Sequence, residues 1–267
     1  MADKKKLLII LNDAPFFLSH RFPVAVAALK KGFEVHIATP NDDKAVKKII
    51  SAGFQHHCIP LHRGKKNPIA ELYLIITLWI LLKNLKPTIA HCVTMKPVLY
   101  AGIISRLMRI PSVHAVTGLG YLFVKNNLIS LILRKIIMKA YHFSLNNKQS
   151  ISIFQNPDDM ALFNNNNIVS KKNCVIIPGC GVDYNKYKPT EKPDGIPIVI
   201  FPARIIGDKG ANEFVEASRI LKSKKINVRL VLVGKNDTQN PTNIKEEKII
   251  EWANEGIIDG GDFQKTW

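Results

Sequence analysis

The sequence predicts an α/β protein with two Rossmann-like, doubly wound domains, the second of them incomplete. Three observations support this. Short apolar runs alternate with longer stretches of helical periodicity, the order typical of βαβ units around a parallel sheet. A stretch without periodicity, residues 184–196, interrupts the alternation, which then resumes. The 267 residues are 46% hydrophobic, enough for cores in two domains.

The first predicted domain covers residues 1–183. Leu7–Leu11 is an apolar run that ends in a polar turn, as expected of a buried strand, and the helix after it closes at Gly32, a favoured residue beyond a helix C-terminus. Further strands are predicted at residues 34–39, 55–59, 88–93, 112–116 and 174–177, and helices at residues 22–31, 43–52, 71–85, 98–109 and 128–139. In a doubly wound domain, ligands bind at the carboxyl ends of the strands.

The second predicted domain covers residues 197–267 and follows the linker at residues 184–196. Its strands are expected at residues 198–201 and 228–233, and its helices at residues 212–222 and 245–254. A complete nucleotide-binding Rossmann domain has more strands than this. The sequence therefore predicts a partial domain.

The net charge of +17 is concentrated in the first domain. Residues 1–150 hold 22 lysines and arginines against 6 acidic residues, whereas residues 151–267 hold 16 against 15. Ten basic side chains and no acidic one lie between Glu71 and Asp158. The positive electrostatic field of such a one-sided charge distribution favours a polyanionic partner, either nucleic acid or anionic lipid.

Two apolar segments favour lipid. Leu72–Leu82 is an apolar run of eleven residues, well short of the roughly 20 that cross a bilayer, and Leu128–Lys139 mixes aliphatic and basic residues like a helix lying on headgroups. The alternative is that each segment is a helix packed on its own sheet. This alternative is favoured for Leu72–Leu82, and for Leu128–Lys139 it has the same weight as binding to lipid. No zinc-finger spacing or aromatic and basic interleaving points to nucleic acid.

The cysteines indicate a reducing compartment. All four lack C-x-x-C spacing, and the start of the chain has no secretory leader pattern. We therefore expect a cytoplasmic protein, peripheral on the inner membrane face if the basic domain binds lipid.

The loops after the first-domain strands supply candidates for binding. The first loop has no G-x-G-x-x-G, which argues against nicotinamide cofactors, but Ser19, His20 and Arg21 could offer hydrogen bonds and charge to an anion. The alternative is that Ser19 simply caps a helix. Thr117 and Gly118 begin a glycine-containing loop that could hold an oxyanion or form a plain turn.

His114 is a minor catalytic candidate. Its ordinary pKa suits a proton relay, although a single histidine within a strand is more often a packed core residue. The other histidines lack the spacing of a metal site, so no metal is expected.

The strongest local pattern lies in the second domain. Arg204 follows the strand at residues 198–201, and Lys209 precedes a helix. Two cations and a helix N-terminus at one place suit a diphosphate, whereas the alternative is an ordinary basic turn. Gly234 and Lys235 end the next strand and would border the same crevice.

Taken together, the sequence resembles the family-4 retaining glycosyltransferases of the GT-B type, which build capsule, O-antigen and lipid-linked glycans. The matching blocks occur in the family's order over almost the whole chain: Phe17–Pro23, Gly32–Pro40, Lys96–Tyr100, Thr117–Gly120, Phe154–Asp159, Ile177–Asp183, Ala203–Arg204 with Asp208–Gly210, and Leu232–Gly234.

The resemblance implies transfer of a sugar, with retention, from a nucleotide diphosphate donor, expected to be UDP-linked, to a lipid-linked or oligosaccharide acceptor. Arg204 and Lys209 match the family's basic pair, which stabilises the leaving diphosphate. The acceptor would lie near Ser19, His20, Lys96, Thr117 and Gly118, with no cofactor or metal.

The resemblance also implies segments that this sequence lacks. The family's donor domain continues into an acidic E-x7-E segment and a helix that returns to the first domain, and the sequence ends before both. Glu247 and Glu255 have that spacing but precede the family position. We therefore expect a truncated transferase whose activity is in question. Two alternatives stay open: a sugar-nucleotide epimerase of the same fold, and a non-catalytic membrane-associated remnant.

Overall fold

A computed structural model describes residues 4–62, 67–117, 128–185, 187–238, 240 and 242–259. The chain divides into two compact units, residues 1–183 and residues 184–267. Among the described residues between Tyr184 and Pro197 there is no helix or strand.

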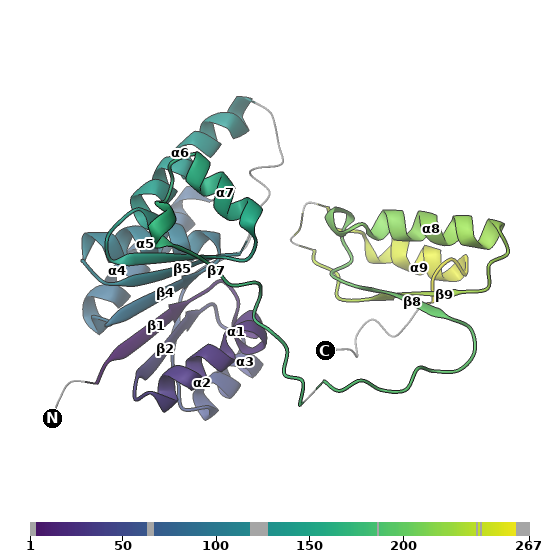
Figure 1. The fold of residues 1–267 in the computed structure, drawn as a ribbon, viewed down its shortest axis with the longest axis horizontal. Coiled ribbons are helices and arrows are strands. Elements are labelled where there is room, and N and C mark those ends of the chain that lie inside the picture. Colours follow the sequence, from purple (N-terminus) through teal and green to yellow (C-terminus); the bar gives the residue numbers. More distant parts are fainter. Residues whose placement is uncertain are drawn as a thin grey trace. The chain divides into compact units, whose positions relative to one another are not determined.

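A seven-stranded parallel sheet forms the centre of unit 1, in the order β3-β2-β1-β4-β5-β6-β7 (Figure 1). The strands are β1 (Lys6–Ile10), β2 (Glu34–Thr39), β3 (Gln55–Cys58), β4 (Ile89–Val93), β5 (Ser112–Val116), β6 (Ser150–Phe154) and β7 (Cys174–Ile176). The chain runs outward from β1 to β3 and then returns to place β4 beside β1, with Leu7 paired to Ile89. The switch point, where such sheets bind ligands, lies between these two strands.

Helices cover this sheet in two layers (Figure 1). One layer contains α1 (Ala14–His20), α2 (Phe22–Lys30) and α3 (Asp43–Ser51), and the other contains α4 (Pro68–Leu85), α5 (Met95–Leu107), α6 (Leu128–Leu145) and α7 (Pro157–Asn165). Because side chains alternate along a strand, Ile9 packs with the first layer, whereas Leu8 and Ile10 pack with the second. Both cores consist mainly of aliphatic and aromatic side chains.

Unit 2 is a smaller α/β unit. Its parallel strands β8 (Ile198–Pro202) and β9 (Arg229–Val233) are accompanied by the 3-10 turn η3 (Gly207–Lys209) and the helices α8 (Ala211–Ser223) and α9 (Glu246–Asn254). Ile205, Val215, Leu232 and Trp252 form its core. The predicted fold class, two α/β units of which the second is short, is confirmed.

The segment after β1 differs from the prediction. Residues 14–20 form helix α1 rather than a loop. The Asp13 carboxylate accepts a hydrogen bond from the Phe16 amide at 3.0 Å, and Pro15 occupies the first turn, where its missing amide costs nothing. A cap and a proline therefore turn the chain into a helix directly at the strand end.

Candidate functional site

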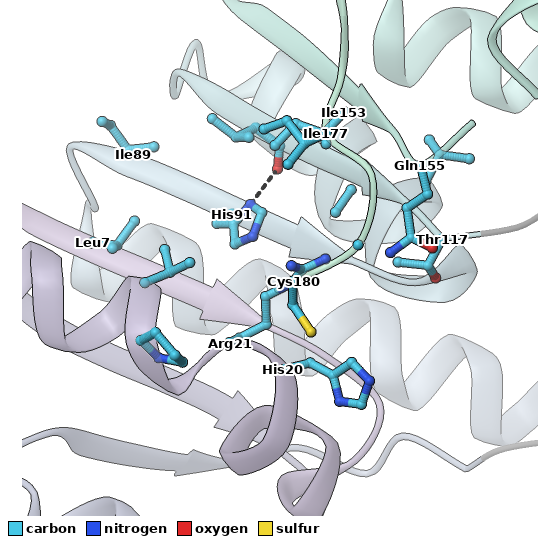
Figure 2. Close-up of a pocket in the computed structure, with 16 residues that line it drawn as sticks. Leu7, His20, Arg21, Ile89, His91, Thr117, Ile153, Gln155, Ile177 and Cys180 are labelled. Atoms are coloured by element: carbon cyan, nitrogen blue, oxygen red, sulfur yellow. Dashed lines mark hydrogen bonds between the residues drawn. The ribbon is translucent and has the colours of Figure 1, made fainter. Parts of the chain in front are cut away.

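A cavity of about 440 Å³ lies in unit 1 on the sheet face that also carries α1–α3 (Figure 2). Its wall is largely aliphatic, with Leu7 of β1, Ile89 of β4, Val113 of β5 and Ile153 of β6. A few polar side chains also line the cavity. Thr117 and Gln155 follow β5 and β6, and His20 and Arg21 lie at the junction of α1 and α2. An apolar wall with few polar groups is typical of a ligand pocket.

Arg21 brings a positive charge into this cavity. It lies between α1 and α2, and its side chain reaches toward His91 and Cys180 (Figure 2). Burial lowers the pKa of Arg21, but a guanidinium stays charged at neutral pH. Its Nε is buried without a hydrogen-bond partner among the described residues. The cavity therefore offers a desolvated cation to an anionic group.

His91 is a neutral neighbour of that cation. Burial, with a smaller contribution from the Arg21 charge, lowers the pKa of His91 to about 4. Its Nδ1 lies 3.2 Å from the Val113 carbonyl oxygen, which can only accept, so Nδ1 carries the proton and Nε2 is left as an acceptor. With so low a pKa, His91 is a weak base and serves as a hydrogen-bond acceptor.

His20 and Thr117 both line the cavity, so the structure brings two of the predicted acceptor-side residues together. The His20 ring stacks on Phe16 with centroids 4.2 Å apart, and its Nδ1 lies 2.7 Å from the Ser19 hydroxyl. Burial, followed by the Arg21 charge, lowers the pKa of His20. His20 is therefore a neutral hydrogen-bonding group at neutral pH.

Ser19 supports His20 rather than capping a helix. Its hydroxyl lies in the last turn of α1, 3.1 Å from the Pro15 carbonyl oxygen, and α2 has no side-chain cap. The interpretation of Ser19 as a helix cap is therefore wrong, because α1 extends through it. Gly118 lies outside the described residues.

Lys96 has a partner for its charge. Its ammonium lies 2.5 Å from the Glu71 carboxylate and donates to the His62 carbonyl oxygen at 2.8 Å. This contact ties the first turn of α4 to the first turn of α5. Lys96 does not line the cavity, so its predicted role at the acceptor has no support from this placement.

His114 is fully buried in the sheet. Burial lowers its pKa to about 3, and its Nε2 lies 2.9 Å from the Ser112 hydroxyl. It does not reach the cavity. This placement favours the packed-core alternative over the proton relay.

In unit 2, two glycine-containing loops meet at the carboxyl ends of β8 and β9. A side chain on Gly234 would collide with the Ala203 carbonyl oxygen, so only glycine permits this approach. The Ile205 amide donates to the Lys235 carbonyl oxygen at 3.2 Å. Arg204, Gly234 and Lys235 are therefore neighbours, as the sequence predicts.

Arg204 is already paired. Its guanidinium lies 2.5 Å from the Asp237 carboxylate, in a pair that is partly exposed. Lys209 ends η3 with an exposed side chain, and Gly210 follows with φ of 87° as the residue directly before α8. Cationic side chains close to a helix N-terminus are favourable for an anion such as a diphosphate, and in this structure Asp237 is the counter-charge of Arg204.

Three further residues were not singled out from the sequence. Gln155 follows β6 and lines the unit 1 cavity, and Asp237 pairs with Arg204. Thr94 directly follows β4, one of the two strands at the switch point, and has φ of 72° and a buried hydroxyl with no partner among the described residues. Such a conformation is costly for a β-branched residue and is typical of functional sites. Of the three, Gln155 had a sequence signal, its place in the matched block Phe154–Asp159.

Known proteins match the chain over nearly its full length. It is 27% identical over 264 residues to the N,N'-diacetylbacillosaminyl-diphospho-undecaprenol alpha-1,3-N-acetylgalactosaminyltransferase of Campylobacter jejuni, covering 91% of this chain and 67% of that protein. Anabaena Alr3699/HepE, solved with UDP-glucose, is similar with a TM-score of 0.64 and 14% identity, covering 96% and 67%. A solved structure from Listeria monocytogenes, described as that of a UDP-N-acetylglucosamine 2-epimerase, has a TM-score of 0.59 and 16% sequence identity. The match covers 95% of this chain and 66% of that one.

The two solved structures show the fold alone, because their sequences have diverged so far. This confirms the GT-B fold, while the chain spans about two thirds of the length of all three proteins. The model of the family described as "Glycosyl transferase 4-like" matches residues 6–156, more than half of the chain. This chain therefore belongs to the glycosyl transferase 4-like family.

Proposed function

We propose that this chain transfers a sugar from a UDP-linked donor to a lipid-linked glycan acceptor, in the synthesis of a cell-surface polysaccharide at the inner face of the membrane. The observation that carries the donor half is the close approach of Arg204 to the Gly234–Lys235 loop, with Lys209 and Gly210 directly before helix α8. The acceptor half draws on the Campylobacter relative, whose name gives a diphospho-undecaprenol acceptor.

The donor site would act through electrostatics. Negative charge develops on the diphosphate as the bond to the sugar breaks, and two cations and a helix N-terminus stabilise that charge. No protein nucleophile and no metal is required by this scheme. Asp237 holds the Arg204 side chain until a diphosphate takes its place.

The cavity in unit 1 would receive the acceptor. Arg21 offers charge to an anionic group, His20 and Thr117 offer hydrogen bonds, and the aliphatic wall suits a lipid or the apolar face of a sugar. His91 Nε2 would accept a hydrogen bond from a sugar hydroxyl. These groups together fit a sugar diphosphate better than a purely neutral sugar.

Calorimetric titration with UDP tests the donor site. We expect binding by the native chain and a loss of about tenfold or more for the Arg204→Ala, Lys209→Ala double variant, since each contact is a charge-assisted hydrogen bond. The control is Lys224→Ala with Lys225→Ala, which removes two charges from the other end of α8. Equal UDP affinity in the double variant would reject this site.

An epimerase is the alternative that the Listeria likeness keeps open. Product analysis separates the two functions. An epimerase converts a UDP-sugar to an isomer with no acceptor present, whereas a transferase leaves the sugar unchanged until an acceptor is added. A new UDP-hexosamine isomer in the absence of acceptor would contradict the proposed transfer.

A further inference from the structure

Helix α4 has two apolar faces. Leu74, Leu78 and Leu82 are buried in the core of unit 1. Six other large apolar side chains of the same helix are between 41% and 78% exposed: Ile69, Leu72, Tyr73, Ile76, Trp79 and Ile80. The prediction that this segment packs on its own sheet therefore accounts for only one of its faces.

The exposed side chains form one continuous stripe. Successive residues of an α-helix are about 100° apart, so Ile69, Tyr73, Ile76 and Ile80 lie in a line, with Leu72 and Trp79 beside it. The line is directly opposite the buried leucines. The stripe runs along a helix of 18 residues, about 27 Å in length. Large exposed apolar surfaces of this kind usually mark an interaction site.

The orientation of α4 is set by the rest of unit 1. Among the described helices, α4 is the one whose length and apolar composition would allow it to cross a membrane. Of its 18 residues, Pro68–Leu85, 17% are buried. The Glu71–Lys96 ion pair and the buried leucines hold α4 flat on the sheet. Its stripe can therefore lie along a surface while the helix stays packed in unit 1.

The charge next to this stripe is positive. Lys83 lies in line with the stripe, Lys86 ends the helix, and both are exposed. Helix α6, in the same layer, exposes Ile132, Lys135, Ile136 and Lys139 on its own outer face. Glu71, the one acidic residue of α4, lies on the core side beside Lys96.

We propose that the outer face of α4, with the basic outer face of α6, docks unit 1 on an anionic lipid bilayer, the α4 stripe lying in the headgroup and acyl-chain boundary. Aliphatic and aromatic groups enter the boundary, and the lysines contact lipid phosphates. This surface deepens the proposed function because it names the part of the chain that meets the membrane. The binding itself requires neither donor nor acceptor.

Vesicle flotation of the full chain with matched variants tests the docking face. Leu72→Ser with Ile76→Ser removes two exposed side chains from the stripe, and Leu29→Ser with Ile50→Ser removes a comparable exposed pair from the other helix layer. We expect flotation with phosphatidylglycerol-containing vesicles, weaker flotation with phosphatidylcholine alone, and a fall in partition of about tenfold or more for the stripe variant only. Unfolding midpoints of both variants verify folding.

Two flotation outcomes would overturn the proposal. One is equal flotation by the two variants. The other is an absence of flotation by the native chain together with a concentration-dependent dimer that the stripe variant abolishes, because the occupant of the stripe would then be a second copy. UDP titration of the same samples reports the donor site separately, so failure of the donor site and failure of docking are distinguishable.

The fluorescence of Trp79 independently reports how deeply the α4 stripe enters the bilayer. The sequence has three tryptophans, so Trp252→Phe with Trp267→Phe leaves Trp79 alone as a fluorophore in the stripe. We expect its emission to move to shorter wavelength on addition of anionic vesicles and to be quenched by brominated lipid. An emission spectrum unchanged by vesicles that do bind the protein would contradict the assignment of α4.

Discussion

The charge on Arg204 is balanced before any donor binds. Asp237, 33 positions along the chain, supplies the carboxylate. In the proposed donor site a diphosphate would compete with this carboxylate for the guanidinium, so Asp237 would both orient Arg204 and weaken anion binding.

Asp237→Asn should strengthen UDP binding. The amide keeps an acceptor oxygen for Arg204 and removes the negative charge, so we expect affinity to rise by about fivefold at low salt, with a smaller gain at high salt. Calorimetry at two salt concentrations measures the change. Weaker binding by this variant would mean that orientation of Arg204 matters more than competition.

The buried histidines of unit 1 make its stability depend on pH. His91 has a pKa of about 4 in the folded protein against an ordinary 6.5, so the unfolded chain binds the extra proton between these values. The free energy of unfolding should therefore fall as pH drops from 6.5 to 4, by about 3 kcal/mol from His91 alone. Stability above pH 6.5 is unaffected by this group.

Urea unfolding at several pH values measures this slope. His91→Gln keeps a donor for the Val113 carbonyl and does not titrate, so its stability should fall less steeply between pH 6.5 and 4. A slope identical to that of the native chain would show that His91 is protonated in the fold.

Sequence reasoning succeeded where a position follows from the ends of adjacent strands. It placed Arg204 beside Gly234 because each directly follows a strand of one parallel sheet. It did not pair Asp237 with Arg204, or Glu71 with Lys96, because the order of strands and helices does not determine which side chains form ion pairs. Nor could it decide whether His114 is buried, because that depends on how α5 and α6 pack.

At the scale of elements, strands with a conventional pattern were predicted to the residue. The strands at residues 34–39 and 112–116 have the predicted bounds. Strand β6 was missed because its pattern is inverted: Ser150 and Ser152 are buried, whereas Ile151 is 42% exposed. In such an alternation the isoleucines are expected on the buried face of the strand and the serines on the exposed face. The buried hydroxyl of Ser150 donates instead to the Leu145 carbonyl oxygen.

The contact between α5 and α6 depends on one glycine. A β-carbon on Gly102 would meet the Ser144 hydroxyl and would lie 2.8 Å from Cε1 of His114. Gly102→Ala should therefore reduce the free energy of unfolding by about 1–3 kcal/mol, despite the better helix propensity of alanine.

A double-mutant cycle identifies the cause of that loss. Ser144→Ala removes the colliding oxygen at the cost of its hydrogen bond to the Val98 carbonyl. The cost of the double variant should therefore be smaller than the sum of the two single costs. Strict additivity would indicate that the extra methyl is accommodated elsewhere.

At the scale of the whole molecule, the described residues form a seven-stranded sheet in unit 1 and a two-stranded sheet in unit 2. The order of the apolar runs predicted both units and every described strand except β6, because hydrophobic periodicity and strand-to-helix alternation are local properties. The sequence could not predict which face of α4 is exposed, because a helix that is apolar on all sides does not indicate which side packs on the sheet.

Whether this chain transfers sugar is tested most directly by following the label of a radioactive UDP-N-acetylhexosamine into a polyprenyl-diphosphate-linked sugar presented in anionic vesicles. The proposed function predicts label in the organic phase for the native chain, and a loss of about a hundredfold or more in rate for the Arg204→Ala, Lys209→Ala double variant. No labelled lipid from a native chain that binds both UDP and vesicles would contradict the proposal, as would equal transfer by the double variant.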